Sequence, residues 1–163
     1  MPQQYQIRPL TLQYVDKVVA LSRRLERDPT PCSYWGLDQN HILQLLSNPQ
    51  KHSLIAVTSE QVVGIATLTR GRQFQQHLAE VSVAVCPEHR KLGIARHLLQ
   101  RLEAHTSVWG VELLKALIWV DNQPSRQLFA SMGFEHRATL YAEFKSPEFG
   151  EMDDCVYYKR LAR

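Results

Sequence analysis

The segment Ala79–Leu99, AEVSVAVCPEHRKLGIARHLL, determines how the rest of the chain is arranged. Its first seven residues are mostly small or β-branched and apolar, which predicts a buried strand that ends before Pro87. Residues 90–95, RKLGIA, then open an amphipathic helix. We therefore predict a strand, a short loop and a helix, with the loop as the functional part.

The loop before this helix is a predicted anion-binding site. The first N–H groups of a helix lack partners and carry partial positive charge from the helix dipole, so phosphate groups bind there when no side chain blocks them. Gly93 removes a Cβ at the point of closest approach, and Ala95 keeps the next position small. Arg90 and Lys91 add positive charge at the rim. The alternative interpretation is an ordinary helix start with two solvated cations.

Two motifs together resemble a known family. The sequence R-x-x-G-x-A at Arg90–Ala95, after a V-x-V-x-P strand end, is similar to the pyrophosphate loop of the GNAT superfamily, the acyl-CoA-dependent N-acetyltransferases. Downstream, Asn122, Leu128-Phe129 and Gly133-Phe134 resemble the N…LYxxxGF segment of that family. The resemblance implies acetyl-CoA as the acyl donor and no metal. It assigns cofactor binding to Val83, Ala84, Val85, Arg90, Lys91, Leu92, Gly93, Ile94, Ala95, Arg96, Asn122 and Phe129.

Composition fits one globular domain, residues 1–163, because 44% of the residues are hydrophobic and 21% are charged. The apolar runs are shorter than the roughly 18 residues that a membrane span needs, and the start MPQQYQ has no signal pattern. We therefore expect a cytoplasmic protein that does not enter a membrane.

Charge and cysteine content limit the expected partners. Cys32, Cys86 and Cys155 have no metal-type or redox-type spacing, so reduced thiols are expected. The net charge of +3 comes from scattered cations, which does not favour nucleic acid, although a nucleic-acid-binding α/β domain is the alternative class. The expected partners are acetyl-CoA and an amine acceptor, and the expected state is a monomer or a homodimer.

The remaining segments predict a mixed α/β fold. Strands are expected at Tyr5–Leu10, Ser53–Thr58, Gln61–Arg70, from His77 to Val85, Val111–Val120, Phe134–Phe144 and Cys155–Leu161. Helices are expected at Thr11–Arg27, from Asp38 to Ser47, Ile94–His105 and from Pro124 to Gly133. A polar loop is expected at Lys145–Asp154. The order β-α-α-β-β-β-α-β-α-β-β is that of the GNAT fold, whose mixed sheet is splayed after the fourth strand and flanked by helices.

The reaction that the resemblance implies needs a base, because an amine must lose a proton before it attacks a thioester. Glu80, four residues before Ala84, matches the glutamate base of some family members, and His77 is the second candidate. An exposed, solvated Glu80 is the structural alternative. Leu117 occupies the position of the base in ribosomal-protein acetyltransferases and cannot take a proton. A backbone N–H among residues 83–85 is expected to stabilise the thioester oxygen.

Phe129 departs from the family pattern. Many relatives have Tyr there as the acid that protonates the departing thiolate, and Phe has no proton to give. Tyr34 or Tyr141 could replace it, although both also fit as aromatic residues that cover the core. Since a thiol has a pKa of about 8.5, it leaves more readily than an alkoxide.

The implied activity is N-acetylation of a small amine or amino acid by direct attack in a ternary complex. Two alternatives stay open: acetylation of a peptide N-terminus or protein lysine, and a catalytically silent module that binds CoA. The acidic residues of the predicted loop would favour a cationic acceptor, unless they are simply solvated. They are Glu148, Glu151, Asp153 and Asp154.

Overall fold

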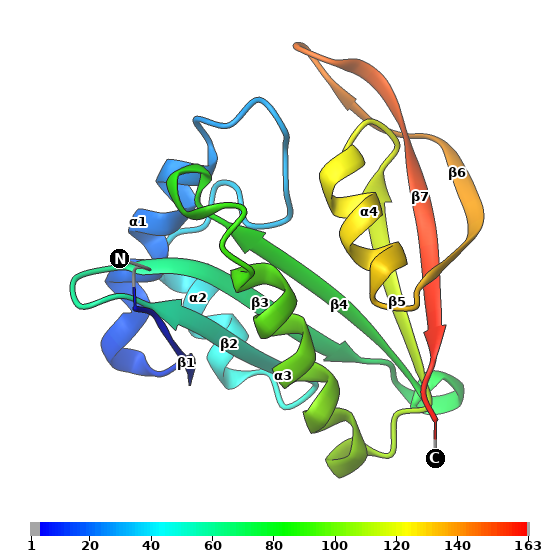
Figure 1. Cartoon of the computed structure of the whole chain (residues 1–163), viewed down its shortest axis with the longest axis horizontal. Coiled ribbons are helices and arrows are strands. Elements are labelled where there is room, and N and C mark those ends of the chain that lie inside the picture. The colour runs from blue at the N-terminus through cyan, green and yellow to red at the C-terminus, as the bar shows by residue number, and fades with distance from the viewer. Residues whose placement is uncertain (1–3, 163) are drawn as a thin grey trace.

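A computed structural model describes residues 4–162, which form one seven-stranded mixed sheet and four α-helices (Figure 1). The strands are β1 (Gln6–Pro9), β2 (Lys51–Val57), β3 (Val62–Arg70), β4 (Leu78–Val85), β5 (Leu113–Trp119), β6 (Glu135–Ser146) and β7 (Gly150–Arg160). The helices are α1 (Val15–Leu25), α2 (Gln39–Ser47), α3 (Ile94–Trp109) and α4 (Gln123–Ser131). The predicted order of elements is confirmed. The start MPQQYQ lies partly outside the described residues.

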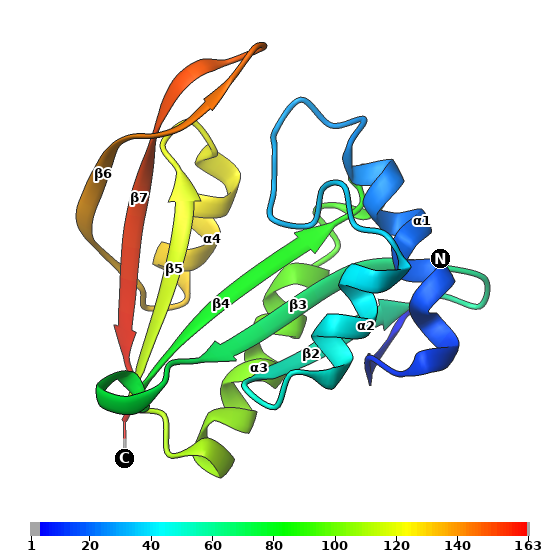
Figure 2. The same ribbon diagram turned by 180° about the vertical axis from the view of Figure 1, so that it is seen from behind.

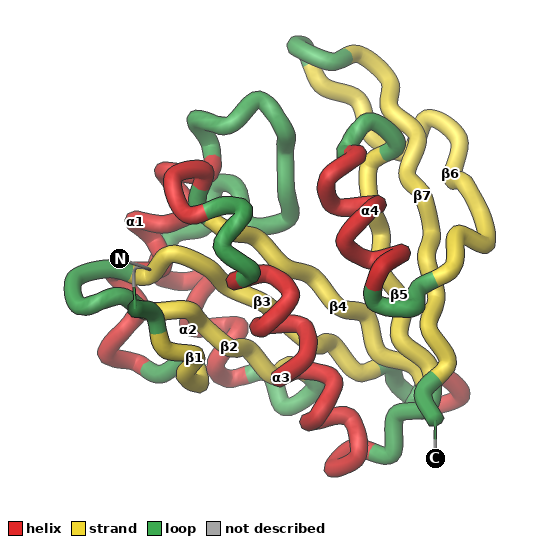
Figure 3. Tube along the Cα trace, in the orientation of Figure 1, coloured by secondary structure: helices red, strands yellow, loops and turns green. Residues whose placement is uncertain are grey.

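The sheet has the order β1-β2-β3-β4-β5-β7-β6 and is built as two arms. Strands β1 to β4 form an antiparallel arm, with α3 on one face and α1 and α2 on the other (Figures 1 and 2). Strands β5, β7 and β6 form a second antiparallel arm, and α4 lies on the same side of the sheet as α3 (Figure 3). None of the helices in residues 4–162 is long and apolar enough to cross a membrane.

The two arms meet at β4 and β5, the one parallel pair among the described strands. They pair at three successive positions that end with Glu80 opposite Lys115. Beyond Glu80 the two strands diverge, and a V-shaped opening separates them (Figures 1 and 2). The splay that the resemblance implied after the fourth strand is therefore present.

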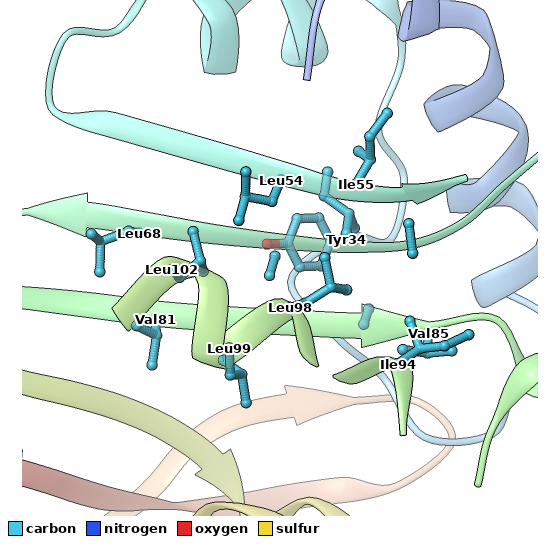
Figure 4. Packing of buried hydrophobic residues seen from close by; sticks show 14 of the residues in the cluster. Tyr34, Leu54, Ile55, Leu68, Val81, Val85, Ile94, Leu98, Leu99 and Leu102 are labelled. Atoms are coloured by element: carbon cyan, nitrogen blue, oxygen red, sulfur yellow. The ribbon is translucent and has the colours of Figure 1, made fainter. Parts of the chain in front are cut away.

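Helix α3 is held on the first arm by a continuous apolar face. Leu98 and Leu102 are fully buried and lie over the strands that carry Leu54 and Leu68 (Figure 4). Because β3 passes directly under the first turns of α3, Gly64 allows close contact there. A Cβ on it would stand 3.2 Å from both Ile94 Cγ2 and Leu98 Cδ1.

We expect Gly64→Val to lower the free energy of unfolding by about 1–3 kcal/mol, because added methyl groups would push α3 away from β3. Gly64→Ala should have a smaller effect in the same direction. The measurement is urea denaturation of the three proteins. Equal midpoints would show that α3 is not tightly packed against β3.

The helix boundaries differ in part from the prediction. The segment Thr11–Arg27 is a 3-10 turn, Leu12–Tyr14, followed by α1, and the Thr11 side chain makes no cap hydrogen bond. The start of α2 is as predicted, since Asp38 accepts a hydrogen bond from the His41 N–H at 3.0 Å. This hydrogen bond lowers the pKa of Asp38.

The predicted polar loop at Lys145–Asp154 is wrong. Strand β6 continues to Ser146 and β7 begins at Gly150, so most of this segment is a long β-hairpin. The charged side chains of β6 are exposed, which lets a polar sequence pair as an edge strand without burying charge. As a result, Asp154 lies inside a strand instead of in a loop.

Candidate active site

The loop before α3 presents backbone amides to open space. Lys91 and Gly93 both have positive φ, of 62° and 80°, and Gly93 is the N-cap of α3. No side chain of the described residues caps this helix, and a Cβ at Gly93 would meet no described atom within 4 Å. The first amides of α3 are therefore available to an external anion. Leu92, Lys91 and Gly93 are exposed, Ala95 is half-buried, and Ile94 is buried against the sheet.

Arg90 in this loop and Arg96 in the first turn of α3 already have partners in the protein. Arg90 forms an ion pair with the buried Asp28, and its Nε donates to the Val85 carbonyl at 3.1 Å. Arg96 Nη2 donates to Ser131 Oγ at 2.6 Å, which joins α3 to the end of α4. Arg90 therefore connects the loop before α3 to the segment between α1 and α2. Lys91, by contrast, forms no ion pair with any of residues 4–162.

On the side that faces the V-shaped opening, the end of β4 carries main-chain groups that do not pair with a strand, although the Val85 carbonyl there accepts from Arg90 Nε. The Cys86 N–H donates to the Val63 carbonyl at 2.9 Å, so even-numbered residues of β4 pair with β3. Bonded and non-bonded pairs alternate in an antiparallel ladder, so Val83 and Val85 point their main-chain groups away from β3. Ala84 was predicted to contribute in the same way, but its main-chain groups face β3.

Glu80 lies at the apex of the opening, at the last position where β4 pairs with β5. It is exposed, and it makes no ion pair with any residue of the described chain. His77 precedes β4 at the closed end, where its carbonyl accepts from the Glu112 N–H at 2.8 Å. Leu117 follows on β5 and is 36% exposed. Of the two candidate bases, Glu80 is the one placed at the opening.

The second motif forms the start and the core-facing side of α4. Asn122 is the N-cap, and its Oδ1 accepts from the Ser125 N–H at 3.2 Å. Phe129 is 3% exposed, and its ring meets Phe134 edge-on at 5.0 Å between centroids. Asn122 therefore acts as a helix cap through its amide oxygen, and its amide nitrogen makes no hydrogen bond with the described residues. Phe129 is part of the core under α4.

Tyr34 ends in a buried chain of hydroxyl groups. Its Oη lies 2.9 Å from Thr67 Oγ1 and 2.7 Å from Ser82 Oγ, and Ser53 Oγ lies 2.9 Å from Thr67 Oγ1. Burial raises the pKa of Tyr34 to about 12, so its proton is held firmly. Tyr34 is thus a core residue, and its hydroxyl contacts Ser82, which lies on the same face of β4 as Glu80, two positions along the strand. The other candidate acid, Tyr141, is 87% exposed on β6.

Asp154, predicted to lie in a polar loop, is a buried carboxylate. It is 1% exposed, and its Oδ1 has no hydrogen-bond partner among the described residues. Burial raises its pKa to about 6, and the negative charges of Glu143 and Glu80 act in the same direction, while Lys115 opposes them. The Asp154 carboxyl is therefore within electrostatic reach of Glu80.

One further group of donor atoms lies next to the anion loop. Cys86, Glu88 and His89 bring one possible ligand atom each within 4.8 Å of one another, with Cys86 Sγ 3.0 Å from His89 Nδ1. This Cys-x-Glu-His spacing contains a single cysteine, so a search for paired-cysteine metal motifs does not reveal it. Burial raises the pKa of the Cys86 thiol, which opposes its ionisation as a metal ligand.

Comparison with known proteins agrees with this geometry. The model of the acetyltransferase (GNAT) family matches residues 18–134. Comparison with curated proteins finds no significant sequence match.

Three solved structures illustrate the similarity of fold. An N-acetyltransferase from Staphylococcus aureus Mu50 has 22% identity and a TM-score of 0.85, covering 98% of this chain and 99% of that one. A ribosomal-protein-alanine N-acetyltransferase from Brucella melitensis has 29% identity and a TM-score of 0.84, covering 96% and 99%. The Salmonella typhimurium protein yncA, solved with its cofactor acetyl-CoA, has 21% identity and a TM-score of 0.84, covering 98% and 95%. Since the family model spans well over half of the sequence, the chain belongs to the GNAT family of acetyltransferases.

Proposed function

We propose that this chain acts as a single catalytic domain that transfers the acetyl group of acetyl-CoA to a primary amine of a small molecule. The observation that supports it most is the pairing of two features: the uncapped start of α3 and the unpaired edge of β4. The diphosphate of CoA binds the amides around Gly93, and the pantetheine arm lies along Val83 and Val85 as an added strand. The thioester then reaches the apex of the opening, where Glu80 lies.

In this mechanism the acceptor is bound beside Glu80, which takes a proton from the ammonium group and leaves a neutral amine. The amine nitrogen attacks the thioester carbonyl, a C–N bond forms, and the main-chain N–H of Val83 or Val85 stabilises the oxygen that becomes negative. The C–S bond then breaks, and CoA leaves as a thiolate. The second proton of the amine passes to water as the amide forms.

Phe129 supplies no proton for the departing thiolate, and the buried Tyr34 holds its own. We propose that the CoA thiolate is protonated by water, because a group with a pKa of about 8.5 leaves without a strong acid. The reaction therefore depends more on the base than on an acid.

The test is release of free thiol from acetyl-CoA, measured with a panel of small amines, amino acids and one peptide with an N-terminal alanine. The peptide is included because the Brucella melitensis neighbour, at 29% identity, is a ribosomal-protein-alanine acetyltransferase. Amine-dependent thiol release supports the proposal. Tight binding of acetyl-CoA with no release for any acceptor would indicate a silent CoA-binding module.

We expect Glu80→Gln to lower turnover on the order of 100-fold at pH 7.5, because the ammonium form of the acceptor then has no base. The loss should shrink as the pH approaches about 10, where the free amine is already present. The measurement is a pH–rate profile of both proteins. Glu60→Gln, an exposed change in the β2–β3 turn, is the matched control. Parallel profiles for wild type and Glu80→Gln would remove Glu80 from the mechanism.

A further inference from the structure

The position of Asp154 makes it a candidate part of the acceptor site. Residues directly opposite each other on paired strands share a face of the sheet, and so do residues two apart on one strand. Glu80 pairs with Lys115, Trp119 lies four residues further along β5, and Asp154 pairs with Trp119. Glu80 and Asp154 therefore lie on one face, on opposite sides of the opening.

This face is not covered by a helix on the second arm, because α4 lies on the other side (Figure 2). Aromatic rings take the place of a helix there. The Trp119 ring stacks on Phe144 with centroids 5.6 Å apart and meets Phe149 edge-on at 6.5 Å. Aromatic faces beside a carboxylate form a favourable environment for an ammonium group.

The charge around Asp154 is unbalanced. The charged groups that act on its carboxyl are Glu80 on β4 and Glu143 on β6, which are negative, and Lys115 on β5, which is positive, so with Asp154 itself three carboxyl groups face one cation in charge. A buried carboxylate is normally paired or hydrogen-bonded, yet Oδ1 of Asp154 has no partner in residues 4–162. An unsatisfied buried acceptor in this position is explained if a ligand supplies the positive charge.

We infer that Asp154, together with Glu80 and Glu143, binds a cationic group of the acceptor, so that the preferred acceptor is a diamine without a carboxylate. This inference rests on the proposed function and narrows its acceptor class. One ammonium group loses its proton to Glu80 and attacks, while the second stays charged beside Asp154. An amino acid is disfavoured, because its own carboxylate would be placed among three others.

The test compares three acceptors of equal chain length at pH 7.5: 1,5-diaminopentane, n-pentylamine and 5-aminopentanoate. They differ in the far end, which is an ammonium, a methyl group or a carboxylate. We expect kcat/KM for the diamine to exceed that for each of the others at least tenfold. Asp154→Asn should reduce this preference to less than threefold, mainly through KM. Equal kcat/KM for the three acceptors would overturn the inference and leave the proposed function standing.

Two further variants separate a site at Asp154 from a general effect of charge. Glu143→Gln changes an exposed residue of the same group and should weaken the diamine preference less than Asp154→Asn does. Glu151→Gln removes a carboxylate from the same strand where it is exposed beside Lys145, and it should leave the preference unchanged. An equal loss in Asp154→Asn and Glu151→Gln would show a general charge effect and contradict a site at Asp154.

Direct binding separates this inference from the proposed function. Calorimetry of the CoA complex should detect the diamine in wild type and much weaker binding in Asp154→Asn. If no acceptor is acetylated but this difference in binding is found, the inference holds and the proposed turnover fails. If the diamine binds no better than n-pentylamine, the inference is wrong whatever the turnover.

Discussion

Gly93→Glu is expected to weaken acetyl-CoA binding at least about 100-fold while leaving the protein folded. The new carboxylate would stand at the first amides of α3, where it competes with the diphosphate for the same donors and repels it. A Cβ at this position meets no described atom within 4 Å, so the side chain causes no clash inside the protein. The positive φ of 80° adds strain of about 1–2 kcal/mol to the folded state. The measurement is calorimetric titration with acetyl-CoA.

The other end of the same helix provides the control for Gly93→Glu. Gly110 is the C-cap of α3, has a φ of 66°, and also has open space where a Cβ would point. Gly110→Glu therefore introduces the same charge and the same kind of strain, but far from the predicted diphosphate. Gly93→Gln tests bulk without charge and should cost less affinity than Gly93→Glu. If Gly93→Glu and Gly110→Glu bind acetyl-CoA equally well, the diphosphate does not bind at Gly93.

Asp154→Asn is expected to stabilise the protein more at pH 8 than at pH 4. The pKa of Asp154 is about 6 in the folded protein, above the ordinary value of 3.8, so the folded state binds this proton more tightly than the unfolded state does. The charged carboxylate therefore costs stability above pH 6, and this cost disappears as the pH falls through 6 to about 4. Asparagine carries no charge and avoids the cost. The free energy of unfolding of the variant, minus that of the wild type, should grow by about 3 kcal/mol from pH 4 to pH 8.

Urea denaturation at both pH values measures this difference. Glu151→Gln, an exposed change on the same strand, should shift stability by less than about 0.5 kcal/mol at either pH. If the variant gains stability but loses its preference for the diamine, the Asp154 carboxylate contributes to binding while it lowers the stability of the folded protein. A stability difference that is the same at pH 4 and pH 8 would show that Asp154 does not bind its proton more tightly in the folded state.

The sequence was sufficient for the parts of the site that depend on local chain geometry. The strand that ends before Pro87, the glycine at the start of α3 and the start of α2 at Asp38 all follow from short-range rules about helix ends and turns. The element order could be read from hydrophobic periodicity. Each of these features depends on residues close together in the chain, so a short segment of sequence is enough to predict it.

The parts that could not be predicted depend on residues far apart in the chain. The ion pair between Arg90 and Asp28 joins positions 62 residues apart, and no local pattern indicates it. Strand β6 is an edge strand with exposed side chains, so the hairpin that turns at 146–150 can be polar. A polar sequence of this kind cannot be told from a loop. The burial of Asp154 contradicts the usual alternation of apolar residues on a core-facing strand, and departures of this kind are typical of functional positions.

The ion pair between Arg90 and Asp28 links the loop before α3 to the segment that carries Tyr34. In the proposed complex the diphosphate binds beside Arg90, and Asp28 connects that arginine to the segment of Tyr34, whose hydroxyl contacts Ser82, two residues from Glu80 on β4. We therefore expect the binding free energies of the two substrates to be coupled. Such a coupling is reciprocal: if acetyl-CoA raises the affinity for the amine, the amine raises the affinity for acetyl-CoA by the same factor.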